Sequence, residues 1–367
     1  MKSPQKLSTS LFAIAVVSGI LFIGSTIAHA QVPADIAAQL RAIGNGVCVP
    51  ETAKIYKPLQ AKAPYPGVTV VRDISYGTDP RMIMDVFAPE KGGGNRPVLI
   101  FVSGGQGNKI EGPPDGDAFY DNIMLWALKN GMTGVNMQRR GGLNGGGLAW
   151  DEPARDVGLV VAWVRANIKK YKGNPNRIFL WSSSAGNGPV STFAAHPEIA
   201  GENGASVKGI VLMSAPNFNI LPETGALPAG TTATPAPAGL GTNCGRPPGQ
   251  PRGGGAAPAG GAGGARGAAG GGRGGAAATV DPATQLARSN LPGLSKGKIA
   301  VFLGWGEIDP PNILSFDEAL KAALCKAGRC PTSEVFKDHS HMSLVFSPNT
   351  ADTSVTGPIL KWMKSVK

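Results

Sequence analysis

A run of strand-forming residues that ends in a turn of small residues constrains this chain more than any other feature. Residues 177–181 are apolar after the first position, and Ser182-Ser183-Ser184-Ala185-Gly186 follows them directly. A helix-compatible segment comes next. Small residues two before and two after a serine let strand and helix pack closely, so that the serine Oγ projects from the end of the sheet. This spacing makes Ser184 the candidate nucleophile, with Gly186 two residues later and Ser182 where glycine is usual.

A serine nucleophile needs a neighbouring base, and the chain has only four histidines, His29, His196, His339 and His341. We expect the first to be cleaved off with the N-terminal segment. The second ends the helix that begins at the serine, so it should point away from the turn. The other two follow a strand-like segment late in the chain, where a loop can place an imidazole over the serine. His341 is the candidate base and His339 the alternative.

The matching acid is expected between serine and histidine in chain order, at the end of another strand. The apolar run 298–305 ends in a turn that carries Glu307 and Asp309. Pro310 favours an extended backbone at the residue before it, so Asp309 is the candidate acid and Glu307 the alternative. A carboxylate there would accept the Nδ1–H of His341 and stabilise the imidazolium.

Backbone donors for an oxyanion are expected after a further buried strand. Residues 96–102 read as such a strand, and Ser103-Gly104-Gly105-Gln106-Gly107 follows. Glycines let backbone N–H groups turn toward a developing negative charge. The residue after the nucleophile supplies another donor. The expected donor set is Gly104, Gly105, Gln106 and Ala185.

The order of these pieces resembles a bacterial α/β-hydrolase of the secreted lipase/carboxylesterase type, in the branch with a His-Gly-Gly-like oxyanion loop. Residues 84–89 and 96–105 resemble the opening strands and the oxyanion loop of that family, and residues 155–167 resemble the helix before its nucleophile strand. Two positions depart from the pattern. Ser103 replaces the histidine before the glycines, and Ser182 replaces the first glycine of the nucleophile turn.

The resemblance implies an α/β-hydrolase fold, a mostly parallel eight-stranded sheet with helices on both faces. It also implies hydrolysis of a carboxylic ester through an acyl-enzyme, with a small-molecule or polysaccharide-linked ester as substrate and with no cofactor or metal. A serine peptidase or amidase on the same fold is one alternative. A non-catalytic secreted binding protein on a degenerate hydrolase fold is another. No oligomeric state is predicted.

Eight strand-like segments support this architecture, because helix-like segments separate most of them from the third onward. The expected strands are Val68–Ile74, Arg81–Phe87, Val98–Val102, Gly134–Gln138, Ile178–Trp181, Gly209–Met213, Ile299–Leu303 and Glu334–Phe336. A glycine-rich loop, Gly141–Gly147, follows the fourth and is expected either to border the pocket or to be a plain turn.

The N-terminus predicts export. Lys2 and Lys6 precede an apolar run, residues 11–27, and Ala28-His29-Ala30 has the small-x-small pattern of a cleavage site. We expect residues 1–30 to be a signal peptide that is removed, giving a secreted or periplasmic protein without a membrane span. An uncleaved membrane anchor is the alternative.

The cysteines fit that compartment, because disulfides persist in oxidising surroundings. Cys325 and Cys330 flank a short loop, where pairing is expected, and Cys48 and Cys244 would form the second bridge. Metal binding is the competing interpretation, but no histidine lies near these cysteines at ligand spacing.

One segment differs in composition from any protein core. Between Pro251 and Val280, 23 of 30 residues are glycine or alanine, so we expect disorder. Its arginines lack interleaved aromatic residues, and we expect no nucleic-acid binding. The net charge of +11 indicates no partner by itself. The expected organisation is a signal peptide (1–30), an N-terminal extension (31–67), a hydrolase domain (68–222 and 280–367) and an insertion (223–279).

Overall fold

The computed structural model describes residues 31–110, 119–141, 147–200, 205–216, 218, 244 and 281–367. The expected signal peptide, nearly all of the Gly/Ala-rich insertion and residues 142–146 of the glycine-rich loop lie outside these described residues.

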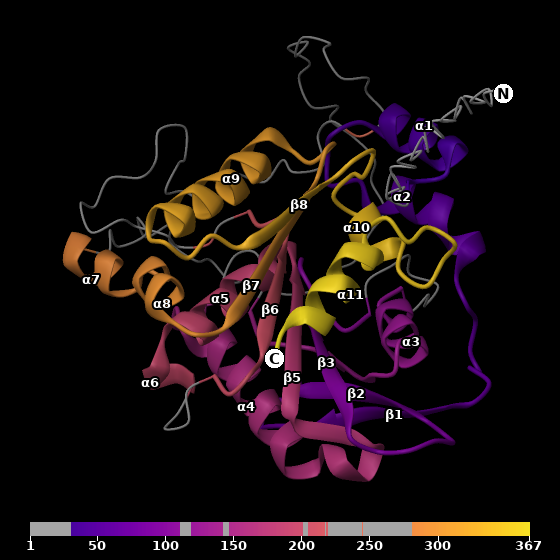
Figure 1. The fold of residues 1–367 in the computed structure, drawn as a ribbon, viewed down its shortest axis with the longest axis horizontal. Coiled ribbons are helices and arrows are strands. Elements are labelled where there is room, and N and C mark those ends of the chain that lie inside the picture. The colour runs from indigo at the N-terminus through magenta and orange to yellow at the C-terminus, as the bar shows by residue number, and fades with distance from the viewer. Residues whose placement is uncertain are drawn as a thin grey trace, which may run out of the picture.

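The core of the protein is an eight-stranded sheet with the order β1-β2-β4-β3-β5-β6-β7-β8 (Figure 1). The first two strands pair antiparallel, as do β2 and β4, and all other neighbours are parallel. The mostly parallel eight-stranded sheet expected from the sequence is therefore confirmed. The strands are β1 (Val68–Ser75), β2 (Ile83–Pro89), β3 (Arg96–Val102), β4 (Thr133–Met137), β5 (Gly173–Ser183), β6 (Gly209–Met213), β7 (Ala300–Gly306) and β8 (Thr332–Phe336).

The central strands are largely apolar because helices bury both faces of the sheet. In β3, Val98 and Ile100 pack into one hydrophobic cluster, whereas Leu99 and Phe101 pack into the cluster on the opposite face. Alternation of this kind follows from the twofold side-chain period of a strand. A continuous apolar run thus serves two cores at once.

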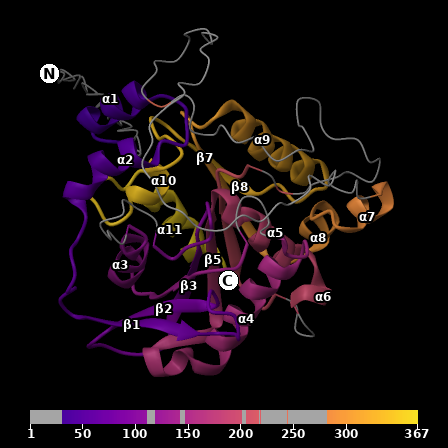
Figure 2. The same ribbon diagram turned by 180° about the vertical axis from the view of Figure 1, so that it is seen from behind.

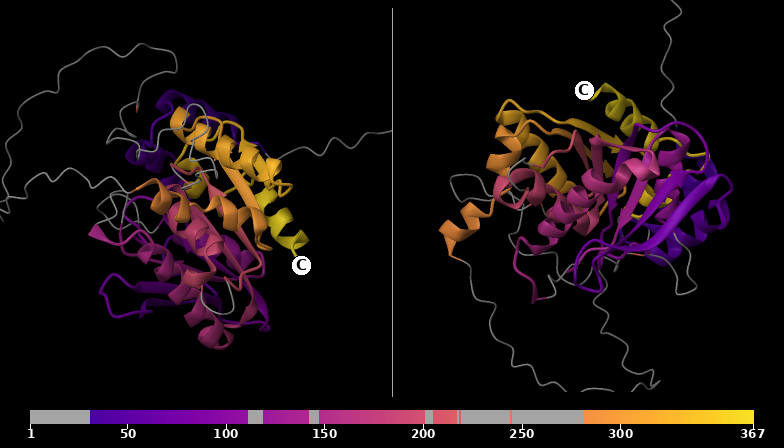
Figure 3. Two further views of the ribbon diagram at one scale, coloured as in Figure 1. Left: turned by 90° about the vertical axis from the view of Figure 1, so that its left-hand side faces the viewer. Right: turned by 90° about the horizontal axis from the view of Figure 1, so that it is seen from below.

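Two groups of helices cover these faces (Figures 1 and 2). One cluster contains residues of α4, α5, α6, α8 and α9, and the other contains residues of α1, α2, α3, α10 and α11. Figure 3 shows the same layers from the side and from below. The helices are α1 (Ala34–Ile43), α2 (Val49–Tyr56), α3 (Asp121–Lys129), α4 (Glu152–Asn167), α5 (Asn187–Ala195), α6 (Pro197–Ala200), α7 (Pro282–Ala287), α8 (Leu291–Lys296), α9 (Pro311–Lys326), α10 (Ser343–Phe346) and α11 (Thr356–Ser365), with short 3₁₀ turns η1 (Lys57–Leu59), η3 (Ile168–Tyr171) and η4 (Ser184–Gly186).

Most strand boundaries differ from the sequence prediction by one to three residues, and the starts of the second and fifth strands illustrate the local structure involved. The second strand begins at Ile83 rather than Arg81, because the N–H of Met82 turns back to the carbonyl of Asp79. The fifth strand begins earlier than expected, at Gly173. The pairing there is irregular: Arg96 pairs with Gly173, but Val98 pairs with Ile178.

The N-terminal extension folds onto the second cluster. Leu40 of α1 and Tyr56 of α2 are fully buried there. The amide of Gln60 donates to the carbonyl of Phe346 in α10, 2.7 Å away. This extension therefore supports the segment that follows β8, where both candidate histidines lie.

Both expected disulfides are present, Cys48–Cys244 and Cys325–Cys330. The first joins α2 to a residue of the insertion, across 196 positions of sequence. The second closes the short loop between α9 and β8.

A cluster of buried charges lies directly after a second glycine-rich loop, residues 103–107, which follows β3. Asp85 in β2 is fully buried and accepts from Lys109 Nζ at 2.6 Å and from Arg72 Nη1 at 2.7 Å. The same guanidinium also contacts Asp121 at the start of α3. Lys109 comes next but one after Gly107, so its ion pair anchors the far end of that loop to the sheet.

We expect Asp85→Asn to lower the free energy of unfolding by about 3 kcal/mol, because it breaks a buried pair and leaves Lys109 and Arg72 undercompensated. Chemical denaturation measures the change. Asp151→Asn is the matched control, since it removes a carboxylate from the i,i+4 pair with the exposed Arg155, a pair worth about 0.5 kcal/mol or less. Equal effects of the two substitutions would contradict a stabilising role for the buried cluster.

Candidate active site

The turn after β5 holds Ser184 in a strained backbone conformation. Its φ is 51°, in the left-handed region that residues with a side chain rarely adopt. A Cβ added to Gly186 would lie 2.4 Å from the carbonyl oxygen of Val102 and 2.7 Å from that of Ser103. Only glycine fits at that position, so the turn packs backbone to backbone against the end of β3. Ser184 itself is partly exposed at the carboxyl edge of the sheet.

Asp309 and His341 lie in contact at the same edge. Asp309 follows β7, His341 follows β8, and the Asp309 Oδ1 to His341 Nδ1 distance is 2.8 Å. Both side chains are only 1% exposed. The other imidazole nitrogen, Nε2, is buried and has no hydrogen-bond partner within the described part of the chain.

The second carboxylate oxygen of Asp309 is also engaged. It accepts from the N–H of Gly306 at 2.7 Å and from Ser214 Oγ at 2.5 Å. Ser214 directly follows β6, and we did not single it out from the sequence. No local pattern marks it, because its partner lies 95 residues away in sequence.

The two alternative residues have other partners. Both ring nitrogens of His339 lie within hydrogen-bond distance of serines, Nδ1 with Ser343 Oγ at 2.8 Å and Nε2 with Ser354 Oγ at 2.6 Å. Burial lowers the pKa of His339 to about 4, so its ring is neutral at physiological pH. Glu307 is exposed and accepts from the N–H of Asp338 at 2.9 Å. His196, at the end of α5, pairs with Glu198 at 2.9 Å.

The glycine-rich loop after β3 lies against the nucleophile turn. A Cβ added to Gly104 would be 2.6 Å from the Cβ of Ser184. Gly105 has a φ of 50°, and the N–H of Gly107 donates to the carbonyl of Gly104 at 2.8 Å. The loop is therefore a tight turn whose backbone comes within contact distance of Ser184.

Three side-chain contacts close this loop. Ser103, which stands where the resembling family has histidine, donates from Oγ to the carbonyl of Asn108 at 2.5 Å. Arg81 Nη2 reaches the carbonyls of Gln106 and Arg139 at 2.8 and 3.1 Å. The departure at Ser103 thus supplies a loop-closing hydrogen bond.

A second buried carboxyl group lies near Asp309. Asp317 in α9 is fully buried, and its Oδ2 has no hydrogen-bond partner among the residues that the structure describes. Burial, with repulsion from Asp309 as a smaller cause, raises the pKa of Asp317 well above its usual range. Burial therefore favours the protonated, neutral form of Asp317.

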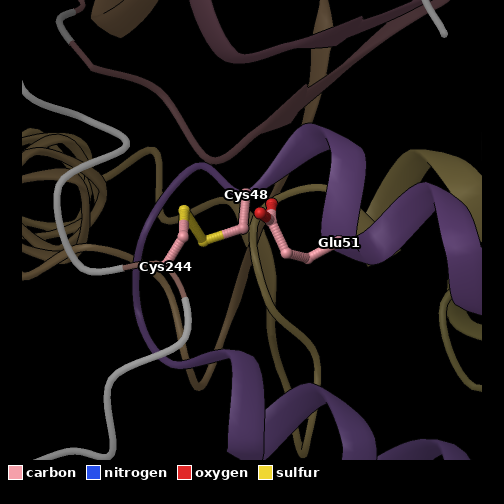
Figure 4. Close-up of side chains that lie close together, drawn as sticks. All are labelled: Cys48, Glu51 and Cys244. Atoms are coloured by element: carbon pink, nitrogen blue, oxygen red, sulfur yellow. A yellow bond between two sulfur atoms is a disulfide. The ribbon is translucent and has the colours of Figure 1, made fainter.

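The side chains of Cys48, Glu51 and Cys244 form the cluster closest to a metal-ligand geometry in the described residues (Figure 4). Metal-binding cysteines act as thiolates. Both sulfur atoms here are bonded to each other, so the cluster offers one carboxylate and no thiolate. The competing metal interpretation of these cysteines does not fit this geometry.

The central segment of the chain is similar to known proteins. Residues 84–201, which include β2 to β5 and the nucleophile turn, match the family described as BD-FAE. The chain is 27% identical to human bile salt-activated lipase over 142 residues, which is 35% of this chain and 19% of the lipase. It is 30% identical to secreted lipase 5 of Gibberella zeae over 166 residues, 38% of this chain and 30% of that protein. The chain thus spans less than a third of the length of both relatives.

Solved structures extend the likeness to most of the chain. A thermostable esterase from Pseudomonas putida ECU1011 superposes with a TM-score of 0.55 at 15% identity, covering 92% of this chain and 98% of the esterase. Together with the strand order, this likeness shows that the protein has the α/β-hydrolase fold. Across the described segments, none of the helices combines the length and apolarity that a membrane span requires.

We expect Asp317→Asn to change stability little at pH 4, because burial raises the pKa of Asp317 well above 3.8 and an amide resembles the neutral carboxyl group in shape and polarity. In the wild type, the raised pKa of Asp317 means that its contribution to stability is complete below the unfolded-state pKa and declines as pH rises toward the raised value. The variant should lack this decline. Thermal unfolding at a series of pH values from 4 to 9 measures both effects.

Asp156→Asn serves as the control, since Asp156 is equally buried but accepts from Arg140 at 2.7 Å. Its loss should cost about 1–3 kcal/mol at each pH. An Asp317→Asn variant whose stability falls with pH as steeply as that of the wild type would show that the pKa of Asp317 is not raised in the native protein.

Proposed function

We propose that the protein hydrolyses carboxylic esters, with Ser184 as nucleophile, His341 as general base and Asp309 as its acidic partner. The observation that carries the proposal is the Asp309–His341 hydrogen bond. It lies at the same edge of the sheet as Ser184, which directly follows β5 and has a left-handed backbone conformation. The named activities of the lipase relatives support the same chemistry. The order of the three residues along the chain is that of α/β-hydrolases.

The reaction proceeds in two steps. Ser184 Oγ attacks the ester carbonyl carbon while His341 Nε2 accepts the hydroxyl proton. The imidazolium then donates that proton to the leaving alcohol, and an acyl-enzyme remains on Ser184. Water then attacks this ester and loses a proton to His341, the imidazolium returns that proton to Ser184 Oγ as the acyl–oxygen bond breaks, and the carboxylic acid is released. Asp309 holds the Nδ1–H throughout and stabilises the imidazolium.

The tetrahedral oxyanion requires donors beside Ser184. We assign them to the backbone N–H groups of Gly104, Gly105, Gln106 and Ala185. The close approach of Gly104 to the Ser184 side chain supports this assignment. Each lost donor should raise the barrier by roughly 2.7–4 kcal/mol.

The proposed setting is outside the cytoplasm. The two disulfides suit an oxidising compartment, and one relative is named a secreted lipase. An exported enzyme of this kind would take a small-molecule ester or an ester carried on a polysaccharide. Screening p-nitrophenyl esters of increasing chain length against acetylated xylan and methyl ferulate distinguishes these substrate classes.

We expect Ser184→Ala to abolish hydrolysis of p-nitrophenyl acetate and labelling by a fluorophosphonate. Ser183→Ala is the matched control, because it removes a hydroxyl from the adjacent residue of the same turn. The control should keep wild-type turnover and labelling. Wild-type turnover in Ser184→Ala would refute the proposed nucleophile, and a folded wild type that neither labels nor hydrolyses would favour a non-catalytic protein.

We expect His341→Gln to lower kcat by several orders of magnitude with little effect on stability, because it removes the base and leaves the loop packing in place. His339→Gln should instead lower the free energy of unfolding by about 1–3 kcal/mol, because the buried serines around it lose a partner. Kinetics on folded protein and thermal unfolding separate these outcomes. The opposite pattern would make His339 the base.

A further inference from the structure

The carboxyl end of β6 lies between the two halves of the proposed site. On one side it contacts the nucleophile turn through Asn187, and on the other it contacts the acid through Ser214. We propose that Asn187 and Ser214 are positioning residues, which hold Ser184 and Asp309 in register through consecutive residues of one strand end. This inference rests on the proposed function.

Asn187 makes every hydrogen bond that its side-chain amide can form. Nδ2 donates to the carbonyl of Ser184 at 2.8 Å and to that of Met213 at 2.6 Å. Oδ1 accepts from the N–H of Met213 at 3.0 Å and from Ser182 Oγ at 2.6 Å. The two carbonyls can only accept and the N–H can only donate, so the orientation of the amide is fixed by its neighbours.

This amide acts on the strained residue itself. The left-handed backbone of Ser184 is unfavourable and persists only where its surroundings enforce it. A hydrogen bond from Asn187 to the Ser184 carbonyl holds the peptide plane in that orientation, and the bonds to Met213 connect it to the sheet. Asn187 is fully buried, so water does not compete for these groups.

The same hydrogen-bonded cluster accounts for the serine at position 182. Its hydroxyl, fully buried, stands where the resembling family has glycine, and it supplies the second donor to Asn187 Oδ1. With glycine at this position, that oxygen would keep only the Met213 N–H. The departure from the usual turn sequence therefore belongs to the positioning of Ser184.

Ser214 continues the chain directly from Met213 and performs the equivalent task for the acid. Its N–H donates to the carbonyl of Gly304 in β7 at 2.9 Å, which fixes its backbone, and its Oγ donates to Asp309 Oδ2 at 2.5 Å. With Gly306 N–H on the same oxygen, the carboxylate is held so that Oδ1 faces His341. Ser214 also has a positive φ, 50°.

That backbone conformation provides a clean test. Ser214→Gly removes the hydroxyl and places glycine where a positive φ favours it, so the fold should tolerate the change. The carboxylate then loses one donor and stabilises the imidazolium more strongly. The acidic limb of the kcat/KM–pH profile should move to higher pH.

We expect Ser214→Gly to lower kcat for p-nitrophenyl acetate by about tenfold or more, with little change in KM, since a misplacement of ~1 Å costs about 10²-fold. Ser206→Gly is the matched control. It makes the same substitution at a positive φ of 47°, just before β6 and therefore at its opposite end. Asp317 and His339, the other titratable groups beside Asp309, are unchanged in both variants.

The outcomes separate a positioning role from a structural one. A lower kcat together with a displaced acidic limb supports the proposal. Equal activity loss at every pH, or wild-type kinetics, overturns it for Ser214. An active Ser184→Ala variant would refute the proposed function itself. If Ser184→Ala is inactive but Ser214→Gly behaves like Ser206→Gly, only the positioning role of Ser214 is refuted.

The nucleophile half is tested with Asn187→Asp and Ser182→Gly. The first keeps the shape of the side chain but turns an oxygen toward two carbonyls, and the second removes only one donor. We expect a large loss of fluorophosphonate labelling rate in the first variant and a smaller loss in the second, without displacement of the acidic limb. The second variant keeps the test decisive if the first does not fold. Wild-type labelling rates in a folded variant would overturn the assignment of Asn187.

Discussion

The backbone contact between the end of β3 and the turn after β5 is the constraint on which the proposed site depends. Gly186 approaches the carbonyls of Val102 and Ser103 so closely that any side chain would collide with them, and Gly104 is pressed against Ser184 in the same way. The contact forces Ser184 outward and brings the glycine-rich loop beside it. The proposed nucleophile and the proposed oxyanion donors are therefore brought together by the packing of two adjacent parallel strands.

The buried ionisable side chains of the protein are stabilised in different ways. Asp85 remains beside two cations, Lys109 and Arg72. Asp317 has no such partner, and burial raises its pKa, whereas burial lowers the pKa of His339, which lies between two serines. Asp309 differs from these groups, because its oxygens are divided between an imidazole on one side and two donors on the other. That division leaves Asp309 Oδ1 only 2.8 Å from His341 Nδ1, whereas Asp352, which is also buried, lies 3.5 Å from the other candidate imidazole at His339 Nε2.

The sequence predicted the features that local composition determines. Strands buried on both faces appear as continuous apolar runs, and Gly186 marks a sharp turn. The eight strands, and the strand that precedes the candidate nucleophile, could therefore be inferred. The sequence analysis preferred His341 but kept His339 as the alternative, because both lie in one irregular loop without periodicity, and in the structure it is His341 that contacts Asp309. Asn187 and Ser214 were missed for a related reason. Their contacts join positions 26 and 95 residues apart, and only the pairing of strands brings such residues together.

The substitution at Ser182 shows why a departure from a family pattern need not weaken a site. Glycine is usual there because strand and helix must approach closely, yet serine adds only a hydroxymethyl group, and its hydroxyl donates a hydrogen bond to Asn187 Oδ1. The same amide fastens the Ser184 carbonyl to the end of β6, so the serine side chain strengthens the turn that glycine would merely permit. Because Met213 and Ser214 are adjacent, the end of β6 contacts both Asn187, which holds the Ser184 carbonyl, and the carboxylate of Asp309. Ser184 and Asp309, which lie far apart in sequence, are therefore both connected by hydrogen bonds to the end of one buried strand.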